Sequence, residues 1–168
     1  MKRTKSRLAV WGVLFLAVLM LQGCSSNENS SDEFQDVWAE AGETVHILFD
    51  FTVSDVAVVD SYDILVPNDG NRLVRMDLSV TNTSNEKYTM FAEDFQLQWG
   101  DGKEDFSTCL AAVDEDMTPY SYTLYPGDSY DSVMVVQIPE DADKLTVAYQ
   151  EKLSDGEDGS AYFVEAEL

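Results

Sequence analysis

The sequence predicts an all-β, antiparallel sandwich. Three observations support this prediction: apolar residues recur at every second position in five segments, turn-forming residues stand between these segments, and helical spacing is not sustained downstream of the N-terminal apolar run. The length of 168 residues is typical of one domain. An apolar content of 45% is sufficient for a packed core, so the chain is not expected to be disordered throughout.

The first alternating segment covers residues 44–53, where Val45, Phe51 and three further apolar residues alternate with polar ones. The same period of two returns at residues 74–81, 95–99, 134–138 and 145–149. Successive side chains of a strand point to opposite faces of the sheet, so each of these segments predicts a strand with one buried face.

Turn residues separate the predicted strands. Gly and Asn tolerate positive φ, and Pro presets φ, where the chain must reverse. Such residues gather at 67–71, 82–85, 100–102, 126–128 and 155–159. Seven or eight short strands with these turns and no crossover helices are typical of a sandwich of immunoglobulin type, here spanning residues 43–168. An open barrel is the alternative, and the Cys and Trp signature of antibody domains is absent.

Residues 1–23 are predicted to form a secretion signal peptide. Four basic residues precede an apolar run at 8–21, which is shorter than the roughly 20 residues that a membrane span needs. An uncleaved membrane helix is the alternative. The sequence Leu21-Gln22-Gly23-Cys24 resembles the bacterial lipobox, in which the cysteine is acylated and becomes the first mature residue. The resemblance implies lipidation at Cys24, with Leu21, Gln22 and Gly23 recognised by the signal peptidase.

The predicted signal peptide and lipidation site imply that the mature chain lies at the extracytoplasmic face of the bacterial cell membrane, held by its lipid anchor. Two acyl chains are sufficient for stable anchoring. Residues 24–42 are rich in Ser, Asn, Asp and Glu and are predicted to be an acidic flexible tether. Phe34 and Trp38 interrupt this composition, either as residues packed on the domain edge or as a partner-docking motif.

The chain is strongly acidic, with 10 Lys and Arg against 32 Asp and Glu and a net charge of −22. Removal of residues 1–23 takes away four basic and no acidic residues, which leaves six basic residues against 32 acidic ones. Nucleic acid is therefore excluded as a partner, because binding to the phosphate backbone requires clustered Lys and Arg.

The middle of the chain resembles the bacterial domain-of-unknown-function 4352 family. The resemblance rests on the strand and Asn turn at 70–86, the Phe95-Gln96-Leu97 strand followed by Asp101-Gly102, and the Pro-Gly turn at 124–129 that leads into the strand at 133–139. It covers residues 43–151 and implies an immunoglobulin-like sandwich, similar to an immunoprotective extracellular antigen, in lipid-anchored or secreted proteins of Gram-positive bacteria. Ser132 and Val136 depart from the residues common in the family. No catalytic residue follows from the resemblance.

The sequence gives little support for catalysis. His46 is the only histidine, it falls on the outward phase of its strand, and it lacks an evident nucleophile. There is no nucleophile elbow, phosphate-binding glycine loop or zinc-spaced cluster. Cys109 is expected to be an inert, mostly buried thiol. We therefore expect a protein that is not an enzyme and has no cofactor, with an envelope hydrolase as the remote alternative.

Two acidic loops are candidate sites for weak calcium binding, because calcium takes six to eight oxygen ligands. They consist of Asp114, Glu115 and Asp116, and of Asp155, Glu157 and Asp158. Neither fits the helix-loop-helix calcium pattern, and solvated loops without metal are the alternative. A calcium-binding or calcium-sensing protein is the corresponding alternative function.

Four tyrosines crowd the segment around residues 119–130 and form a candidate partner-binding face: Tyr120, Tyr122, Tyr125 and Tyr130. Tyrosine offers a rigid ring with a polar tip, although packing in the core or at a sheet edge is the alternative. The nearby acids imply a cationic partner. The sequence thus predicts a membrane-anchored, non-catalytic binding or accessory module of the cell envelope, whose partner is an unknown protein or other cationic molecule.

Overall fold

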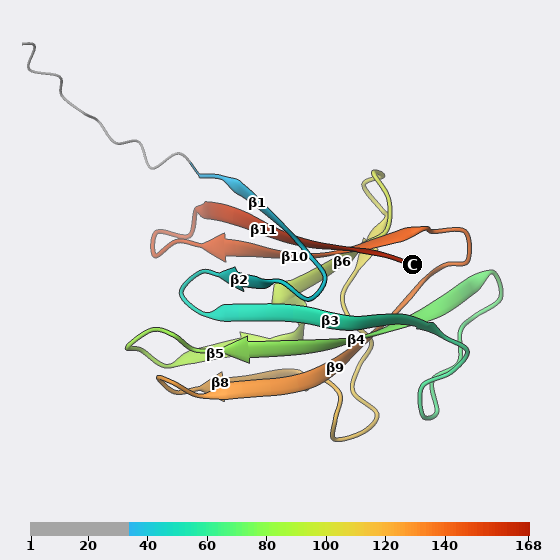
Figure 1. The fold of residues 1–168 in the computed structure, drawn as a ribbon, viewed down its shortest axis with the longest axis horizontal. Helices are drawn as coiled ribbons and strands as arrows, with labels where there is room; N and C mark the ends of the chain where they lie inside the picture. The colour runs from blue at the N-terminus through green and yellow to red at the C-terminus, as the bar shows by residue number, and fades with distance from the viewer. Residues whose placement is uncertain (1–33) are drawn as a thin grey trace, which may run out of the picture. The chain divides into compact units, whose positions relative to one another are not determined.

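The structure is a computed structural model that describes residues 34–168 (Figure 1). The predicted signal peptide, the recognition residues Leu21, Gln22 and Gly23, and the lipidation site Cys24 lie outside the described residues. Among residues 34–168, no helix has the length and apolar character needed to cross a membrane.

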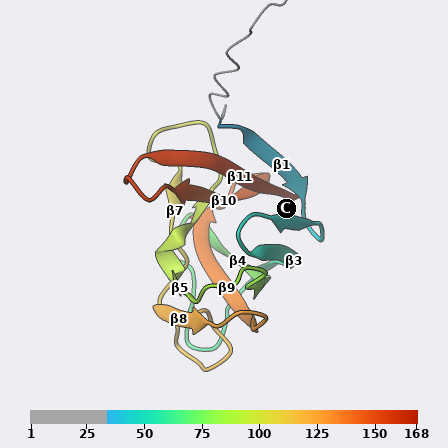
Figure 2. The ribbon, with the colours of Figure 1, turned by 90° about the vertical axis from the view of Figure 1, so that its left-hand side faces the viewer.

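Two main sheets pack face to face, which confirms the predicted antiparallel, immunoglobulin-like β-sandwich (Figures 1 and 2). The described residues contain eleven strands rather than seven or eight, because several edge strands are too short to show a period. A single-turn 3-10 helix, η1 (Ala92–Asp94), precedes β6. The strands are β1 (Asp36–Glu40), β2 (Thr44–His46), β3 (Asp50–Val59), β4 (Asn71–Thr81), β5 (Tyr88–Phe91), β6 (Phe95–Gln98), β7 (Phe106–Ser107), β8 (Ser121–Leu124), β9 (Ser129–Pro139), β10 (Lys144–Lys152) and β11 (Asp158–Glu167).

The five-stranded sheet has the order β1-β11-β10-β6-β7, and the four-stranded sheet has the order β2-β3-β4-β9. Strands β5 and β8 form a separate two-stranded sheet. All paired strands are antiparallel except β1, which lies parallel to β11 at the edge of its sheet.

The core lies between the two main sheets and contains the predicted alternating residues. Val74, Met76, Leu78 and Val80 of β4 are all at most 1% exposed. Their neighbours on β9 include Met134, which pairs with Met76. Full burial of an aliphatic side chain of this size stabilises the fold by about 1.5–3 kcal/mol, so this face of β4 is a major source of stability.

Strand β9 is buried on both faces. Met134 and its alternate neighbours face the main core, whereas Val133 and Val135 join Leu73 and Met117 in a second apolar cluster. Backbone hydrogen bonds hold the segment that covers this cluster, from Thr118 N–H to Val133 O at 2.9 Å and from Val133 N–H to Asp116 O at 2.8 Å. The covering segment also protects the edge of β9 from pairing with another chain.

The strand predicted over residues 44–53 is wrong as a single element, because the chain reverses at 47–49 and forms the β2–β3 hairpin. Val45 pairs with Phe51 across the hairpin, and both side chains are buried. The reversal keeps the apolar residues in phase on one face, so alternation alone does not distinguish one long strand from this hairpin.

The predicted boundary between tether and domain is also wrong. Strand β1 lies inside the range 24–42 and pairs with five residues of β11. Trp38 stacks on Phe163, with ring centroids 4.4 Å apart. Backbone pairing and one aromatic contact hold β1, whose residues are mostly exposed, so a composition-based boundary misses it.

Candidate binding cleft

The structure contains a cleft of about 270 Å³. Three regions build it: the β2–β3 turn, the β5–η1 segment and the end of β10. We call it the end cleft. Its lining residues are Ile47, Leu48, Phe49, Tyr88, Thr89, Met90, Phe91, Asp94, Tyr149, Gln150, Glu151 and Lys152.

The walls of the end cleft are largely aromatic. Phe49 is buried and meets Tyr149 edge to face, with ring centroids 5.0 Å apart. Tyr88 and Phe91 of β5 are half-buried and complete the aromatic lining. Leu48 contributes an apolar side chain that is 51% exposed. Such concave surfaces, apolar with a few polar groups, are where proteins usually bind ligands.

Asp94 is the acidic residue of the β5–η1 wall. Its Oδ2 accepts a hydrogen bond from the backbone N–H of Phe91 at 2.7 Å, which fixes the carboxylate at the start of η1. Burial raises the pKa of Asp94, against the opposing effect of that hydrogen bond. Burial, reinforced by the negative charge of Asp94, raises the pKa of Tyr149 to about 12. The Tyr149 phenol therefore stays neutral at physiological pH and lies within electrostatic reach of Asp94.

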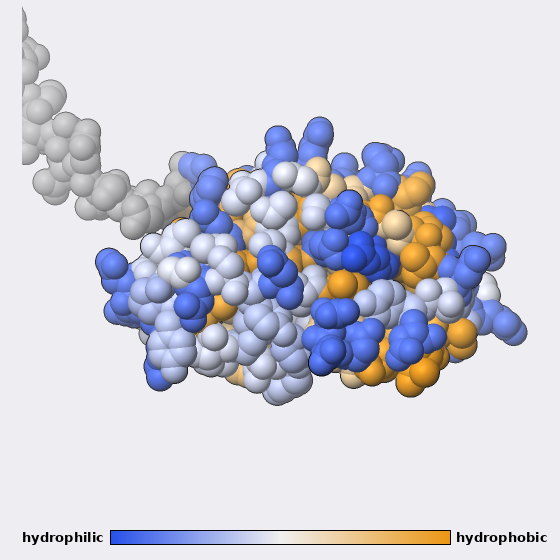
Figure 3. All heavy atoms as spheres, turned by 60° about the horizontal axis from the view of Figure 1, so that its bottom comes forward, coloured by the Kyte–Doolittle hydropathy of each residue, from blue (hydrophilic) through white to orange (hydrophobic). Residues whose placement is uncertain are grey.

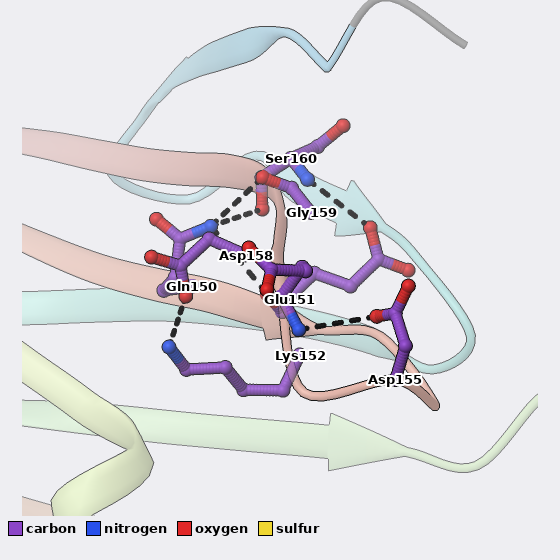
Figure 4. A network of polar contacts seen from close by, with 8 residues as sticks. Gln150, Glu151, Lys152, Asp155, Asp158, Gly159 and Ser160 are labelled. Atoms are coloured by element: carbon purple, nitrogen blue, oxygen red, sulfur yellow. Dashed lines mark hydrogen bonds and ion pairs between the residues drawn. The ribbon is translucent and has the colours of Figure 1, made fainter.

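The β10–β11 hairpin orders the rim of the cleft (Figure 4). Gln150 Nε2 donates to the carbonyl oxygen of Gly159 at 2.8 Å, and Glu151 Oε2 accepts from Ser160 N–H at 3.3 Å. The ammonium group of Lys152 forms an ion pair with Asp158. The one basic residue of the cleft lining is thus paired with a carboxylate of the hairpin rather than with Asp94.

A second, more polar groove of about 470 Å³ lies on the outer face of the four-stranded sheet. Arg75 and Asp77 form an ion pair there, and Asp116 and Asp131 add negative charge. In Figure 3, apolar side chains gather toward the right-hand side of the molecule, the side on which the β3–β4 connection lies in Figure 1. Exposed apolar residues of β3 and this connection include Ile64 and Val66, at 75% and 69% exposure. Tyr62 of the β3–β4 connection is the aromatic residue in the lining of this groove.

The structure divides the four predicted tyrosines into two pairs. Tyr122 and Tyr130 are half-buried against the main core and stack with ring centroids 4.5 Å apart. Tyr120 and Tyr125 are 72% and 61% exposed. Tyr120 also lines a groove of about 390 Å³ beside Cys109. The four side chains therefore do not share one environment, and only two of them are available at the surface.

The predicted calcium ligands do not converge. Among the described residues, no group of three or more His, Cys, Asp or Glu side chains is placed to hold a metal ion. Asp114 Oδ1 accepts from the N–H groups of Asp116 and Met117 at 2.9 and 3.1 Å, and Asp155 Oδ1 accepts from Glu157 N–H at 3.1 Å. Asp114 and Asp155 therefore shape their turns, and Asp158 pairs with Lys152.

His46 and Cys109, the two residues considered for catalysis, lie on different elements of the fold. The His46 side chain is 71% exposed, and its Nδ1 lies 2.7 Å from Asp50 Oδ1 across the β2–β3 hairpin. Cys109 is a free, partly buried thiol, and burial raises its pKa. A raised pKa disfavours the thiolate that nucleophilic chemistry needs.

Sequence reasoning missed the end cleft. Phe49 and Tyr149 were expected only as core positions, and Tyr88 and Asp94 were not singled out. These residues come from elements about 40 to 100 positions apart, and each fits an ordinary strand or turn pattern. The one local feature is the spacing of Asp94, three residues after Phe91, which is typical of a carboxylate that caps a helical turn. This spacing predicts a turn and not a ligand site.

Comparisons with known proteins agree with this architecture. A solved structure from Bacillus subtilis, the ycdA protein described as a "putative lipoprotein", matches with a TM-score of 0.59 and 13% identity over 77% of this chain. This chain spans 39% of the ycdA chain. The yjhA protein of B. subtilis matches with a TM-score of 0.56 and 19% identity, over 75% of this chain and 97% of its own. No curated protein matches the sequence. The family model for the domain of unknown function DUF4352 matches residues 39–159, and the chain therefore belongs to the DUF4352 family.

Proposed function

We propose that this protein is a lipoprotein, anchored through Cys24 to the extracytoplasmic face of the bacterial cell membrane, whose sandwich is a non-catalytic binding or accessory module of the envelope. The observation that carries the binding role is the end cleft, with its aromatic walls and the Asp94 carboxylate. The lipobox-like sequence at 21–24 carries the proposed anchoring.

The fold neighbours support the location. The ycdA protein shares the fold, and its description as a lipoprotein matches the lipobox-like sequence of this chain. The yjhA protein, with 97% of its own chain covered, supports the view that the sandwich is a complete folding unit in such proteins.

The dispersion of reactive groups supports a non-catalytic role. Within the described residues, His46 and Cys109 lie on different elements and neither lines the end cleft. The cleft instead offers aromatic rings, the carboxylates of Asp94 and Glu151 and the neutral phenol of Tyr149, which are suited to recognition by shape and charge.

Metabolic labelling tests the anchoring. Cells that express the full chain are fed an alkyne-bearing palmitate, and the membrane and soluble fractions are compared with those of a Cys24→Ser variant. We expect the unaltered protein to carry the label and sediment with membranes, and the variant to lose the label. Cys109→Ser is the matched control and should remain labelled. An unlabelled wild-type protein would refute the proposed function.

A further inference from the structure

We infer that the end cleft binds a lysine side chain of a polypeptide partner, with the ammonium group placed at Asp94 and the aliphatic stem packed against the aromatic walls. This inference rests on the proposed function, because it assigns a ligand to the binding module. It commits the cleft to one occupant, a lysyl residue presented by another polypeptide.

The size of the end cleft favours a single side chain. Its volume of about 270 Å³ lies below the range of roughly 300–1,000 Å³ that is typical of small-molecule sites. An extended lysine can lay its four methylene groups on an apolar wall while its charged end reaches a polar group. Leu48 and the half-buried Tyr88 provide such a wall, and Leu48 is 51% exposed.

The charge of the end cleft favours a cation. The ion pairs of the described residues are His46–Asp50, Arg75–Asp77, Lys144–Glu165 and Lys152–Asp158, so Asp94 has no cationic partner among residues 34–168. Glu151 also lines the cleft, and the one basic lining residue, Lys152, is paired with Asp158. A partly buried carboxylate without a counterion is costly, and a bound cation would relieve that cost.

The geometry at Asp94 favours an ammonium over a guanidinium. Oδ2 already accepts the Phe91 N–H at 2.7 Å, so a ligand that binds both carboxylate oxygens must share Oδ2 with that N–H. Arginine is best recognised by two parallel hydrogen bonds to both oxygens of a carboxylate, whereas lysine acts as a point charge with three rotatable donors. The hydroxyl group of Tyr149 is a second acceptor within electrostatic reach of Asp94.

The same geometry disfavours a quaternary ammonium ligand. Such a group has no N–H donor, so it would leave the free oxygen of Asp94 without a hydrogen bond after removing it from water. A lysyl ammonium donates hydrogen bonds and still contacts the rings.

Titration by NMR tests the inference on the full mature chain, ¹⁵N-labelled and solubilised in detergent micelles. The probe is lysine capped as its N-acetyl, N-methylamide derivative. The comparison ligands are the equally capped norleucine, which has an apolar stem and no ammonium, capped arginine and choline. We expect the lysine derivative to shift the amide signals of β5, η1 and the end of β10, with the highest affinity of the four.

Two variants locate the ammonium group. Asp94→Asn retains an acceptor for the Phe91 N–H and removes the charge, so we expect it to weaken lysine binding by about tenfold. Glu93→Gln is the matched control, because it removes the same charge from the adjacent exposed residue, which does not line the end cleft. We expect the control to bind lysine as the unaltered chain does.

Several results would overturn the inference. Equal binding of norleucine would show a purely apolar pocket, and tighter binding of arginine or choline would assign a different cation. Equal weakening in Asp94→Asn and Glu93→Gln would indicate a general charge effect. If Asp94→Asn does not fold, the comparison of lysine with norleucine on the unaltered chain still decides. A failure of lysine binding would not change palmitate labelling at Cys24, so the two experiments distinguish failure of this inference from failure of the proposed function.

Discussion

The side-chain amide of Asn82 donates a hydrogen bond to the carbonyl oxygen of Leu124, 3.1 Å away, and so ties the end of β4 to the end of β8. The same amide donates to Glu86 O at 2.6 Å, and Asn82 Oδ1 accepts from Ser84 N–H at 3.0 Å. Asn82 is 1% exposed. One buried side chain therefore satisfies three backbone groups.

Replacement of Asn82 by Ala is expected to lower the free energy of unfolding by about 3 kcal/mol, because it removes one buried and two partly buried hydrogen bonds to the backbone, and a buried group left without a partner costs about 1–3 kcal/mol. Urea unfolding measures the change. Asn85→Ala, in the exposed part of the same turn, is the control and should stay within about 0.5 kcal/mol of the unaltered protein. A similar decrease in the free energy of unfolding in both variants would contradict the stabilising role of the Asn82 hydrogen bonds.

Asp94→Asn is expected to be at least as stable as the unaltered protein at neutral pH. Burial raises the pKa of Asp94 above its ordinary value of 3.8, so the native state retains a proton that the unfolded chain has released. The stability from this proton is complete below the ordinary pKa and is lost as pH rises through the raised native pKa. The advantage of the Asn variant should therefore shrink on acidification.

The measurement is the difference in unfolding free energy between Asp94→Asn and the unaltered chain from about pH 3 to about pH 7. Glu93 lies beside Asp94, and Tyr122 and Tyr149 face it from β8 and β10; burial raises the pKa of both tyrosines, so they stay neutral over this range. Glu93→Gln controls for the general loss of negative charge. A less stable Asn variant at neutral pH would mean that the carboxylate serves the fold rather than a ligand.

Trp38→Ala is expected to loosen β1 without affecting the core. The stack of Trp38 on Phe163 contributes about 0.5–1.5 kcal/mol beyond area burial, which corresponds to about a two- to tenfold faster local opening. Hydrogen exchange of the Ala41 N–H, which is bonded to Glu165 O at 3.0 Å, reports this opening. Exchange in β4 should not change.

Phe106→Ala is the matched control for Trp38→Ala, because Phe106 is a 49% exposed aromatic residue at the opposite edge of the same sheet. It should leave Ala41 protected. Rapid exchange of Ala41 in the unaltered protein would show that β1 does not hold in solution.

Calcium is expected to stabilise the protein no more than magnesium at equal ionic strength. The carboxylates of Asp114 and Asp155 already accept backbone hydrogen bonds, and Asp158 is paired with Lys152. Both cations screen the net charge of −22 in the same way, so a general effect cancels in the comparison. Thermal unfolding with each cation and with a chelator measures this, and a higher melting temperature with calcium alone would restore the calcium hypothesis.

The sheets were predictable where one face is apolar and the other polar. This holds for β4, β6 and β10, whose alternating residues are the buried ones. Strand β11 was not predicted. Tyr162 and Val164 are two residues apart, but Phe163 between them is also apolar, so the sequence shows a continuous apolar run and no alternation. That outer phenylalanine has a physical reason, since it stacks on Trp38.

The end cleft could not be predicted from local patterns. It depends on the distance between the β2–β3 turn, β5 and β10, which tertiary packing sets. Asp94 has the same sequence appearance as many turn carboxylates, and only its burial among Tyr88, Phe91 and Tyr149 distinguishes it. The lipobox-like sequence at 21–24 is the opposite case, because its four residues are contiguous and the resemblance can be seen in the sequence alone.

The parallel pairing of β1 with β11 has a mechanical consequence. A force applied at the N-terminal end of β1 and directed along the strand would load the hydrogen bonds of the five paired residues in shear, together rather than one at a time. Such a ladder resists tension better than a hairpin pulled open from its end. Strand β1 is mostly exposed, and its parallel pairing with β11 is the feature that would resist its removal from the sheet under tension.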